Sequence, residues 1–391
     1  MKFAHISDLH IGKYLKGYSL LEDQRYILKQ IIQRLKEARP DALMIAGDIY
    51  DKSVPSGEAF SLFDDFLGWL DELPFSMPVL IIAGNHDSPE RLDFASSFLE
   101  RHHIYISTLP PQQPDEYLKK ISLQDSFGNL NVYLLPFTKP GDLKGRGVVS
   151  EEALTNYQSA VQALLHRENI DWKERNVLIS HQFYQGGDRR TEVCDSELAS
   201  LQVGGLEVID SAIIKDFDYV ALGHIHGPQQ AGYPNIRYSG TPLKYSVSEV
   251  KHRKSITIVT IREKGEPLEI QQIPLVPLRE VREETGKLEE IRARISEENK
   301  EDYFSITLTD EMELHRPKEA LEYQLSHLLE LRFENQRTRS LLEGQNRNVR
   351  ELQPGEAFAQ FFQMMQCRSL NEEEQAVMDS VFEHVLGEDT K

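Results

Sequence analysis

The sequence carries metal-ligating residue types in five separated segments, each at the end of a short apolar run. In chain order these segments read Asp-Leu-His, Ala-Gly-Asp, Gly-Asn-His-Asp, Ser-His-Gln and Gly-His-Ile-His. One such segment would be weak evidence, but five in order indicate a single site. The candidate metal ligands within them are Asp8, His10, Asp48, Asn85, His181, His224 and His226.

The mixture of carboxylate, amide and imidazole donors suits divalent ions such as Mn²⁺, Fe²⁺ or Zn²⁺. No cysteine cluster accompanies them, which argues against a structural zinc site. Seven ligands are too many for one ion and enough for two if one carboxylate bridges, and Asp48 is the best candidate for the bridge. A pair of ions clamps a phosphate, lowers the pKa of a bound water and stabilises charge on the attacking and leaving oxygens.

His86 is expected to act differently from the ligands, because neighbouring residues rarely both point into one coordination sphere. We expect Asn85 to bind metal, and His86 to contact the phosphate and protonate the leaving oxygen. A carboxylate hydrogen-bonded to the other ring nitrogen would fix the tautomer of His86. Asp51 and Asp87 are both candidates for that role, and Asp51 is favoured because it lies three residues beyond Asp48.

The elements that position these residues read as alternating strands and helices over the first 262 residues. Short, β-branched apolar runs predict buried strands. These runs lie at 2–7, 42–46, 79–83, 132–137, 176–180, 219–222 and 255–261. Helices are predicted at 20–38, 57–72, 89–101 and 151–168, and a hairpin at 228–239. Each ligand group follows a strand, which is where ligands bind in open α/β sheets.

The chain changes character after residue 265, so that the first domain is expected to span 1–265. A Pro-punctuated connector then leads to a small α+β domain at 275–335. Its expected elements are a helix at 284–296, a strand at 303–309 and a helix at 317–330. A polar linker at 336–354 precedes a pair of amphipathic helices within 355–391, which bury too little to be stable alone and are expected to dock on a partner.

Composition narrows the class of protein. The chain has 391 residues, 40% hydrophobic and 27% charged, as in soluble globular proteins of two or three domains. It shows no run long enough to span a membrane, and its opening residues do not resemble a secretory signal. The two cysteines, Cys194 and Cys367, form no disulfide framework, so a cytoplasmic location is expected. The net charge of −19 is unusual for a protein that binds nucleic acid, but the acidic excess is concentrated in the C-terminal third.

The predicted helices at 57–72 and 89–101 carry more large apolar residues than one buried helix face can hold. About half of these residues are expected to pack against the sheet. The remainder are expected to form a homodimer interface with twofold symmetry.

The five ligand segments resemble those of the calcineurin-like metallophosphoesterase superfamily, over the first 260 residues or so. The resemblance implies an α/β (α+β) fold, a four-layer αββα sandwich with a dinuclear metal centre. Carried onto this sequence, the first metal would take Asp8, His10, Asp48 and His226. The second metal would take Asp48, Asn85, His181 and His224.

A narrower resemblance, over nearly the whole chain, is to the SbcD family, the nuclease components of bacterial SbcCD complexes. It is carried by Gly-Asp-Ile-Tyr-Asp-Lys-Ser-Val-Pro-Ser and by Tyr-Ser-Gly-Thr-Pro-Leu-Lys-Tyr-Ser at 238–246. It implies an ATP-dependent 3′→5′ exonuclease on duplex DNA ends that also cuts single strands and hairpins, usually with Mn²⁺. In that family a small capping domain positions DNA, C-terminal helices dock on the coiled-coil ATPase SbcC, and a homodimer gives a heterotetramer with SbcC.

Two alternative functions remain open. A metal-dependent phosphatase of the same superfamily would use the same ligands, although Lys52 stands where the protein phosphatases carry arginine. An inactive scaffold that binds DNA ends is the second alternative, and the complete ligand set argues against it. Cleavage of a duplex end but not of a phosphomonoester would exclude the phosphatase, and a normal complex without nuclease activity would support the scaffold.

Overall fold

The computed structural model describes residues 1–187, 191–195, 197, 208–312 and 314–334, with a few single residues beyond 357. The linker predicted at 336–354 lies outside these residues, as does nearly all of the helix pair predicted at 355–391. The chain divides into two units. One comprises Met1–Glu283, Ile295–Ser305 and Glu322–Glu330, and the other Glu284–Arg294, Ile306–Leu321 and the chain from Leu331 onward.

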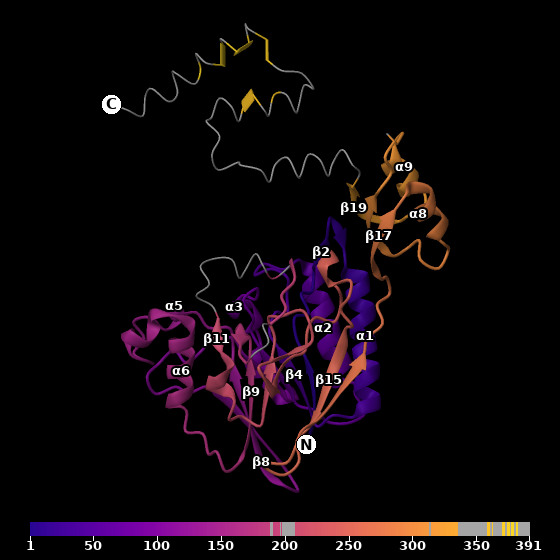
Figure 1. Cartoon of the computed structure of the whole chain (residues 1–391). Coiled ribbons are helices and arrows are strands. Elements are labelled where there is room, and N and C mark those ends of the chain that lie inside the picture. Colours follow the sequence, from indigo (N-terminus) through magenta and orange to yellow (C-terminus); the bar gives the residue numbers. More distant parts are fainter. Residues whose placement is uncertain are drawn as a thin grey trace. The chain divides into compact units, whose positions relative to one another are not determined.

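Two six-stranded sheets form the framework of the first unit (Figure 1). The first sheet has the order β16-β15-β1-β4-β5-β6, in which the last four strands are parallel and β15 pairs antiparallel with both β1 and β16. Its strands are β1 (Lys2–Ile6), β4 (Ala42–Ala46), β5 (Val79–Ile82), β6 (Ile104–Ser107), β15 (Ser255–Thr260) and β16 (Glu269–Pro274).

The second sheet has the order β13-β14-β12-β9-β8-β7, with four parallel strands between two antiparallel edges. Its strands are β7 (Lys119–Asp125), β8 (Gly128–Leu135), β9 (Arg175–Ser180), β12 (Tyr219–Leu222), β13 (Gln229–Ala231) and β14 (Tyr233–Tyr238). β13 and β14 form the hairpin predicted at 228–239.

The two sheets pack face to face. Alternate residues of each strand point to opposite sides, so that one set faces the other sheet and the other set faces the helices. Ala42, Met44 and Ala46 of β4 belong to the core between the sheets, together with residues of β8, β9 and β12. Leu43 and Ile45 of the same strand belong to the core beneath α1 (Leu21–Ala38) and α2 (Gly57–Asp71). α6 (Tyr157–Arg167) covers the outer face of the second sheet. The predicted four-layer αββα sandwich is confirmed.

Short elements complete this unit. They are β2 (Tyr14–Leu15), β3 (Tyr18–Ser19), α5 (Pro140–Leu143), η2 (Glu151–Thr155), β10 (Tyr184–Gln185), β11 (Ile209–Asp210), η3 (Ser211–Ile214) and η4 (Val247–Glu249). No helix among the described residues has the length and apolar character needed to cross a membrane.

The helix predicted at 89–101 is wrong as a single element. The structure has α3 (Pro89–Leu92), α4 (Ser96–Leu99) and η1 (Glu100–His102). Ala95 separates α3 from α4 with a φ of 62°, a left-handed conformation that stops a right-handed helix. The apolar spacing misled the prediction because Phe94 and Phe98 are exposed rather than buried, with 83% and 58% of their surface accessible.

The three-stranded sheet near the C-terminal end of the described chain has the order β17-β18-β19. Its elements are β17 (Val281–Gly286), α8 (Leu288–Arg294), β18 (Tyr303–Leu308), α9 (Pro317–Glu322) and β19 (His327–Phe333). The helix predicted at 317–330 is therefore wrong beyond residue 322. The run Leu-Leu-Glu-Leu fits the periodicity of a helix as well as that of a strand. Its pairing with β18, which the sequence cannot show, makes it the strand β19.

Two glycines let the sheets approach closely where β4 ends. A Cβ added at Gly223, directly after β12, would lie 1.9 Å from the carbonyl oxygen of Ala46. A Cβ added at Gly47 would lie 2.3 Å from Nδ1 of His181, and Gly47 has a φ of +89°. These positions accept no side chain without moving a strand end.

Gly223→Ala is expected to lower the free energy of unfolding by about 1–3 kcal/mol, the usual cost of overpacking a filled interior. Gly68→Ala is the matched control, because a Cβ at Gly68 in α2 meets nothing within 4 Å and alanine favours the helix. Denaturant unfolding followed by circular dichroism measures both variants. Equal stability of Gly223→Ala and wild type would contradict the close approach.

Candidate metal centre

The predicted ligands follow the carboxyl ends of strands from both sheets. Asp8 follows β1 and Asp48 follows β4 in the first sheet, while His181 follows β9 and His224 follows β12 in the second. All four side chains are buried. Since the strands that carry them are parallel within each sheet, their carboxyl ends meet at one edge of the sandwich.

The Asp48 carboxylate lies between histidines from different segments. Its Oδ2 is 3.2 Å from Nε2 of His181 and 3.6 Å from Nε2 of His10. Its Oδ1 accepts a hydrogen bond from the backbone N–H of His86 at 2.9 Å. Asp48 therefore lies between the segments that carry His10 and His181.

Asn85 brings a third type of donor to the same place. Its Oδ1 lies 3.1 Å from Nε2 of His181 and 3.0 Å from Nδ1 of His224. The backbone N–H of His224 donates to Oδ1 of Asp8 at 2.9 Å, which ties the loops after β1 and β12 together. Asn85, His181 and His224 therefore converge beside Asp48.

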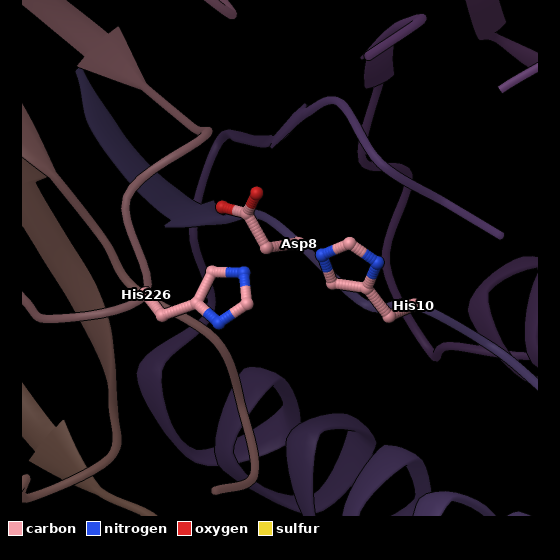
Figure 2. Close-up of side chains that lie close together, drawn as sticks. All are labelled: Asp8, His10 and His226. Carbon is pink, nitrogen blue, oxygen red and sulfur yellow. The ribbon is translucent and has the colours of Figure 1, made fainter. Parts of the chain in front are cut away.

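Asp8, His10 and His226 form a second convergence (Figure 2). Their candidate ligand atoms all lie within 4.8 Å of one another, and all three residues are buried. The ring centroids of His10 and His226 are 5.1 Å apart. The structure thus brings the seven predicted ligands together in two overlapping groups.

The donor set fits divalent ions. Both ring nitrogens of His10 are buried and make no hydrogen bond within the described part of the chain. A buried polar atom without a partner is costly, whereas a buried imidazole nitrogen that binds a metal is not. The mixture of imidazole, carboxylate and amide donors suits Mn²⁺, Fe²⁺ or Zn²⁺.

Burial and neighbouring carboxylates shift the pKa values within the centre. Burial raises the pKa of Asp8 to about 6. Burial lowers the pKa of His181, but the Asp48 and Asp8 carboxylates and the hydrogen bond to Ala46 together outweigh burial and raise that pKa to about 9. Burial also holds the pKa of His10 well below its usual value. A proton on His181 supplies part of the positive charge that bound cations would bring.

The ligand loops hold an unusual backbone conformation. Asp8, His10, Asp48 and His224 have φ angles of 53°, 42°, 51° and 88°. Such left-handed conformations are uncommon for residues other than glycine, and they persist where the surrounding structure enforces them. These residues lie in three loops, after β1, β4 and β12, and each loop turns sharply after its strand.

His86 and Asp51 meet, but through the backbone of Asp51. Nδ1 of His86 donates to the carbonyl oxygen of Asp51 at 2.8 Å, whereas a carboxylate contact was expected. The Asp51 carboxylate instead accepts from Nζ of Lys13 at 2.7 Å. Asp87, the other candidate, accepts from the backbone N–H groups of Ile49, Tyr50 and Gly84 at 2.9–3.1 Å. Asp87 therefore holds the loop after Asp48 rather than the ring of His86.

The centre opens to solvent beside His86. An open depression of about 500 Å³ is lined by Lys52, Ser53, Val54, Asn85 and His86. His86 and Asn85 are partly exposed, unlike the buried ligands around them. The depression therefore adjoins the candidate metal ligand Asn85.

Sequence reasoning missed the residues that hold the His10 loop. Nε2 of Gln24, a buried residue of α1, donates to the carbonyl oxygen of His10 at 2.7 Å, and its Oε1 accepts from the N–H of Gly12 at 3.0 Å. The rings of Tyr245 and His10 pack edge to face, with their centroids 5.6 Å apart. The signal available in the sequence was that Gln24 is a polar residue at a position on the buried face of the predicted helix.

Comparison with known proteins agrees with this geometry. Residues 1–228 match the family model described as calcineurin-like phosphoesterase, and residues 274–366 match the type 5 capsule protein repressor C-terminal domain. Among solved structures, a dimetal phosphatase from Danio rerio aligns with 13% identity and a TM-score of 0.39, covering 71% of this chain and 96% of that chain, too distant a likeness to carry weight.

Two curated relatives are much more similar, and both are the SbcD component of an SbcCD nuclease. The relative from Staphylococcus epidermidis is 35% identical over 334 residues, which cover 85% of each chain. The relative from Staphylococcus saprophyticus is 36% identical over 311 residues, which cover 79% of this chain and 78% of its own. The chain therefore belongs to the calcineurin-like phosphoesterases and, among them, to the SbcD family of nuclease components.

Proposed function

We propose that this chain is the nuclease component of a complex of the SbcCD type, a phosphodiester hydrolase that processes DNA ends in the cytoplasm during replication, recombination and repair. The observation that carries the proposal is the convergence of seven metal-ligating side chains, from both sheets, beside a partly exposed histidine and an open depression. The finer activities are an ATP-dependent 3′→5′ exonuclease on duplex ends and an endonuclease on single strands and hairpins.

Asp8, His10, Asp48 and His226 would hold one ion, and Asp48, Asn85, His181 and His224 would hold the other. We propose Mn²⁺ for both, because these mixed oxygen and nitrogen donors suit it. When bound, such a pair of ions polarises the phosphate and supplies a nucleophile at neutral pH. The protein itself keeps the donors in place. Asp87 supports the Asp48 loop, and Gln24 supports the His10 loop.

His86 is proposed to protonate the leaving oxygen. Its Nδ1–H is engaged by the carbonyl oxygen of Asp51, which fixes the ring and leaves Nε2 as the nitrogen that can transfer a proton. The position of His86 on the wall of the depression supports this role, because a scissile phosphate in the depression would lie beside the ring. The Asp51 carboxylate, paired with Lys13, keeps the loop that supplies this carbonyl in place.

Other parts of the chain are proposed to serve the assembly. The small domain at 275–335 would position DNA, and the helices predicted within 355–391 would dock on an SbcC-type ATPase with a coiled coil. A homodimer through 57–72 and 89–101 would then give a heterotetramer with that ATPase. The exposed Phe94 and Phe98 support this interface, because large apolar side chains gathered in one segment of the surface are typical of interaction sites.

His86→Ala is expected to lower DNA cleavage about 10²–10⁴-fold while leaving metal binding unchanged, because a general acid contributes roughly that factor. The test is Mn²⁺-dependent cleavage of an end-labelled DNA hairpin, with and without the ATPase partner. Wild-type protein that cuts no DNA but hydrolyses a simple phosphoester would favour the phosphatase instead. An intact complex without nuclease activity would favour the inactive scaffold.

Asp48→Asn is expected to weaken both bound ions together, because one carboxylate would serve both. The exposed Asp216→Asn makes the same chemical change away from the site and is expected to bind metal like wild type. Metal content after dialysis with a chelator and re-addition of Mn²⁺ measures the effect. Full occupancy of both positions in Asp48→Asn would contradict the bridging role.

Replacing Phe94 and Phe98 together by serine is expected to shift the protein from dimer to monomer, because it removes apolar area from the proposed interface. Phe127→Ser is the matched control, since Phe127 is also exposed but lies at the turn between β7 and β8. Light scattering coupled to size-exclusion chromatography reports the mass. A double variant that stays dimeric would exclude this interface.

A further inference from the structure

Glu249 is a fully buried carboxylate for which the chemistry proposed above has no role. It ends η4, just beyond the segment 238–246. Its Oε1 lies 3.3 Å from Nδ1 of His226, on the opposite side of the ring from Nε2. Glu249 therefore contacts a proposed metal ligand, His226, on the side of the ring that faces away from Nε2.

Lys254 fixes this carboxylate in place. Its Nζ donates to Oε2 of Glu249 at 2.6 Å, to Oγ1 of Thr241 at 2.6 Å and to the carbonyl oxygen of His226 at 3.0 Å. Lys254 and Thr241 are both buried. A buried carboxylate is tolerated when it is paired and hydrogen-bonded in this way, and the same ammonium also anchors the backbone of His226.

The loop between Thr241 and Glu249 adds further donors. The backbone N–H of Tyr245 donates to Oε1 of Glu249 at 3.3 Å, and Oγ of Ser246 donates to the same oxygen at 3.2 Å. These contacts hold the carboxylate in place independently of its contact with His226. An acceptor fixed so firmly can orient the imidazole ring rather than follow it.

The other histidines of the centre are held differently. His181 donates its Nδ1–H to the backbone carbonyl of Ala46 at 2.6 Å. Nδ1 of His10 lies 3.7 Å from Oδ1 of Asp51, beyond hydrogen-bond distance. The carboxylate support of His226 would therefore act on the metal position that His226 serves and not on the other.

We propose that Glu249 is a positioning residue that fixes the ring and the Nδ1–H tautomer of His226, and so sets the affinity of the metal position formed by Asp8, His10, Asp48 and His226. The inference rests on the ligand assignment of the proposed function. A carboxylate that accepts from the second nitrogen of a metal-bound histidine orients the ring and makes it a more basic ligand.

The test is Glu249→Gln in the full chain. A carboxamide keeps the size of the side chain but presents an N–H group to Lys254 or to His226, so it cannot satisfy both. Titration of the metal-free protein with Mn²⁺, by calorimetry and electron paramagnetic resonance, is expected to show one of two bound ions weakened roughly 10–100-fold and the other unchanged. Cleavage of a DNA hairpin is expected to regain the wild-type kcat at saturating Mn²⁺.

Asp125→Asn is the matched control, because it makes the same change in the ion pair with the buried Arg175, between β7 and β9. It is expected to lower stability without changing either Mn²⁺ affinity. Glu249→Gln combined with Lys254→Met removes both buried charges and guards against a folding defect in the single variant. The double variant is expected to show the same selective loss of one ion.

Unchanged affinity for both ions in the Glu249 variants would overturn the inference, and so would equal weakening of both. Wild-type protein that binds two Mn²⁺ ions but cuts no DNA would remove the proposed nuclease function and leave the role of Glu249 intact. Wild-type protein that binds a single Mn²⁺ ion would overturn both.

Discussion

The structure depends on holding the buried carboxylates of Asp8 and Asp48 near one another where two sheets meet. Two like charges away from water are unfavourable unless positive charge lies between or beside them. Burial raises the pKa of Asp8, and the neighbouring carboxylates raise that of His181. Divalent cations beside these carboxylates would offset the repulsion between them, and such cations can promote the hydrolysis of a phosphodiester.

The sandwich makes this arrangement possible by bringing strand ends from two sheets to one place. Each sheet contributes parallel strands whose carboxyl ends point to the same edge. Gly47 and Gly223 allow the two sets of ends to approach more closely than any side chain would permit. The left-handed turns at Asp8, His10 and Asp48 then direct the donors inward. The energetic cost of these turns is offset by the packed core on both sides of each sheet.

Residues that touch no substrate carry much of the positioning. Asp87 gathers three backbone N–H groups around the Asp48 loop, Gln24 joins α1 to the loop of His10, and Lys254 joins Glu249 to His226. These contacts link segments that are far apart in the sequence. Rigid support of this kind keeps metal ligands within the narrow tolerance that catalysis needs.

The sequence by itself predicted the ligand set and the strands that precede each ligand, because motif order and apolar periodicity are local properties of the chain. The four-layer class of fold came from the resemblance of these motifs to the calcineurin-like phosphoesterases. It also indicated that His86 differs from its neighbour Asn85. Only the tertiary structure decided that Asp51 meets His86 through its carbonyl group and that β19 is a strand. It alone revealed the contact of Glu249 with His226. Each of these depends on which distant segment lies alongside, and hydrogen-bond partners across a fold leave no local pattern in the sequence.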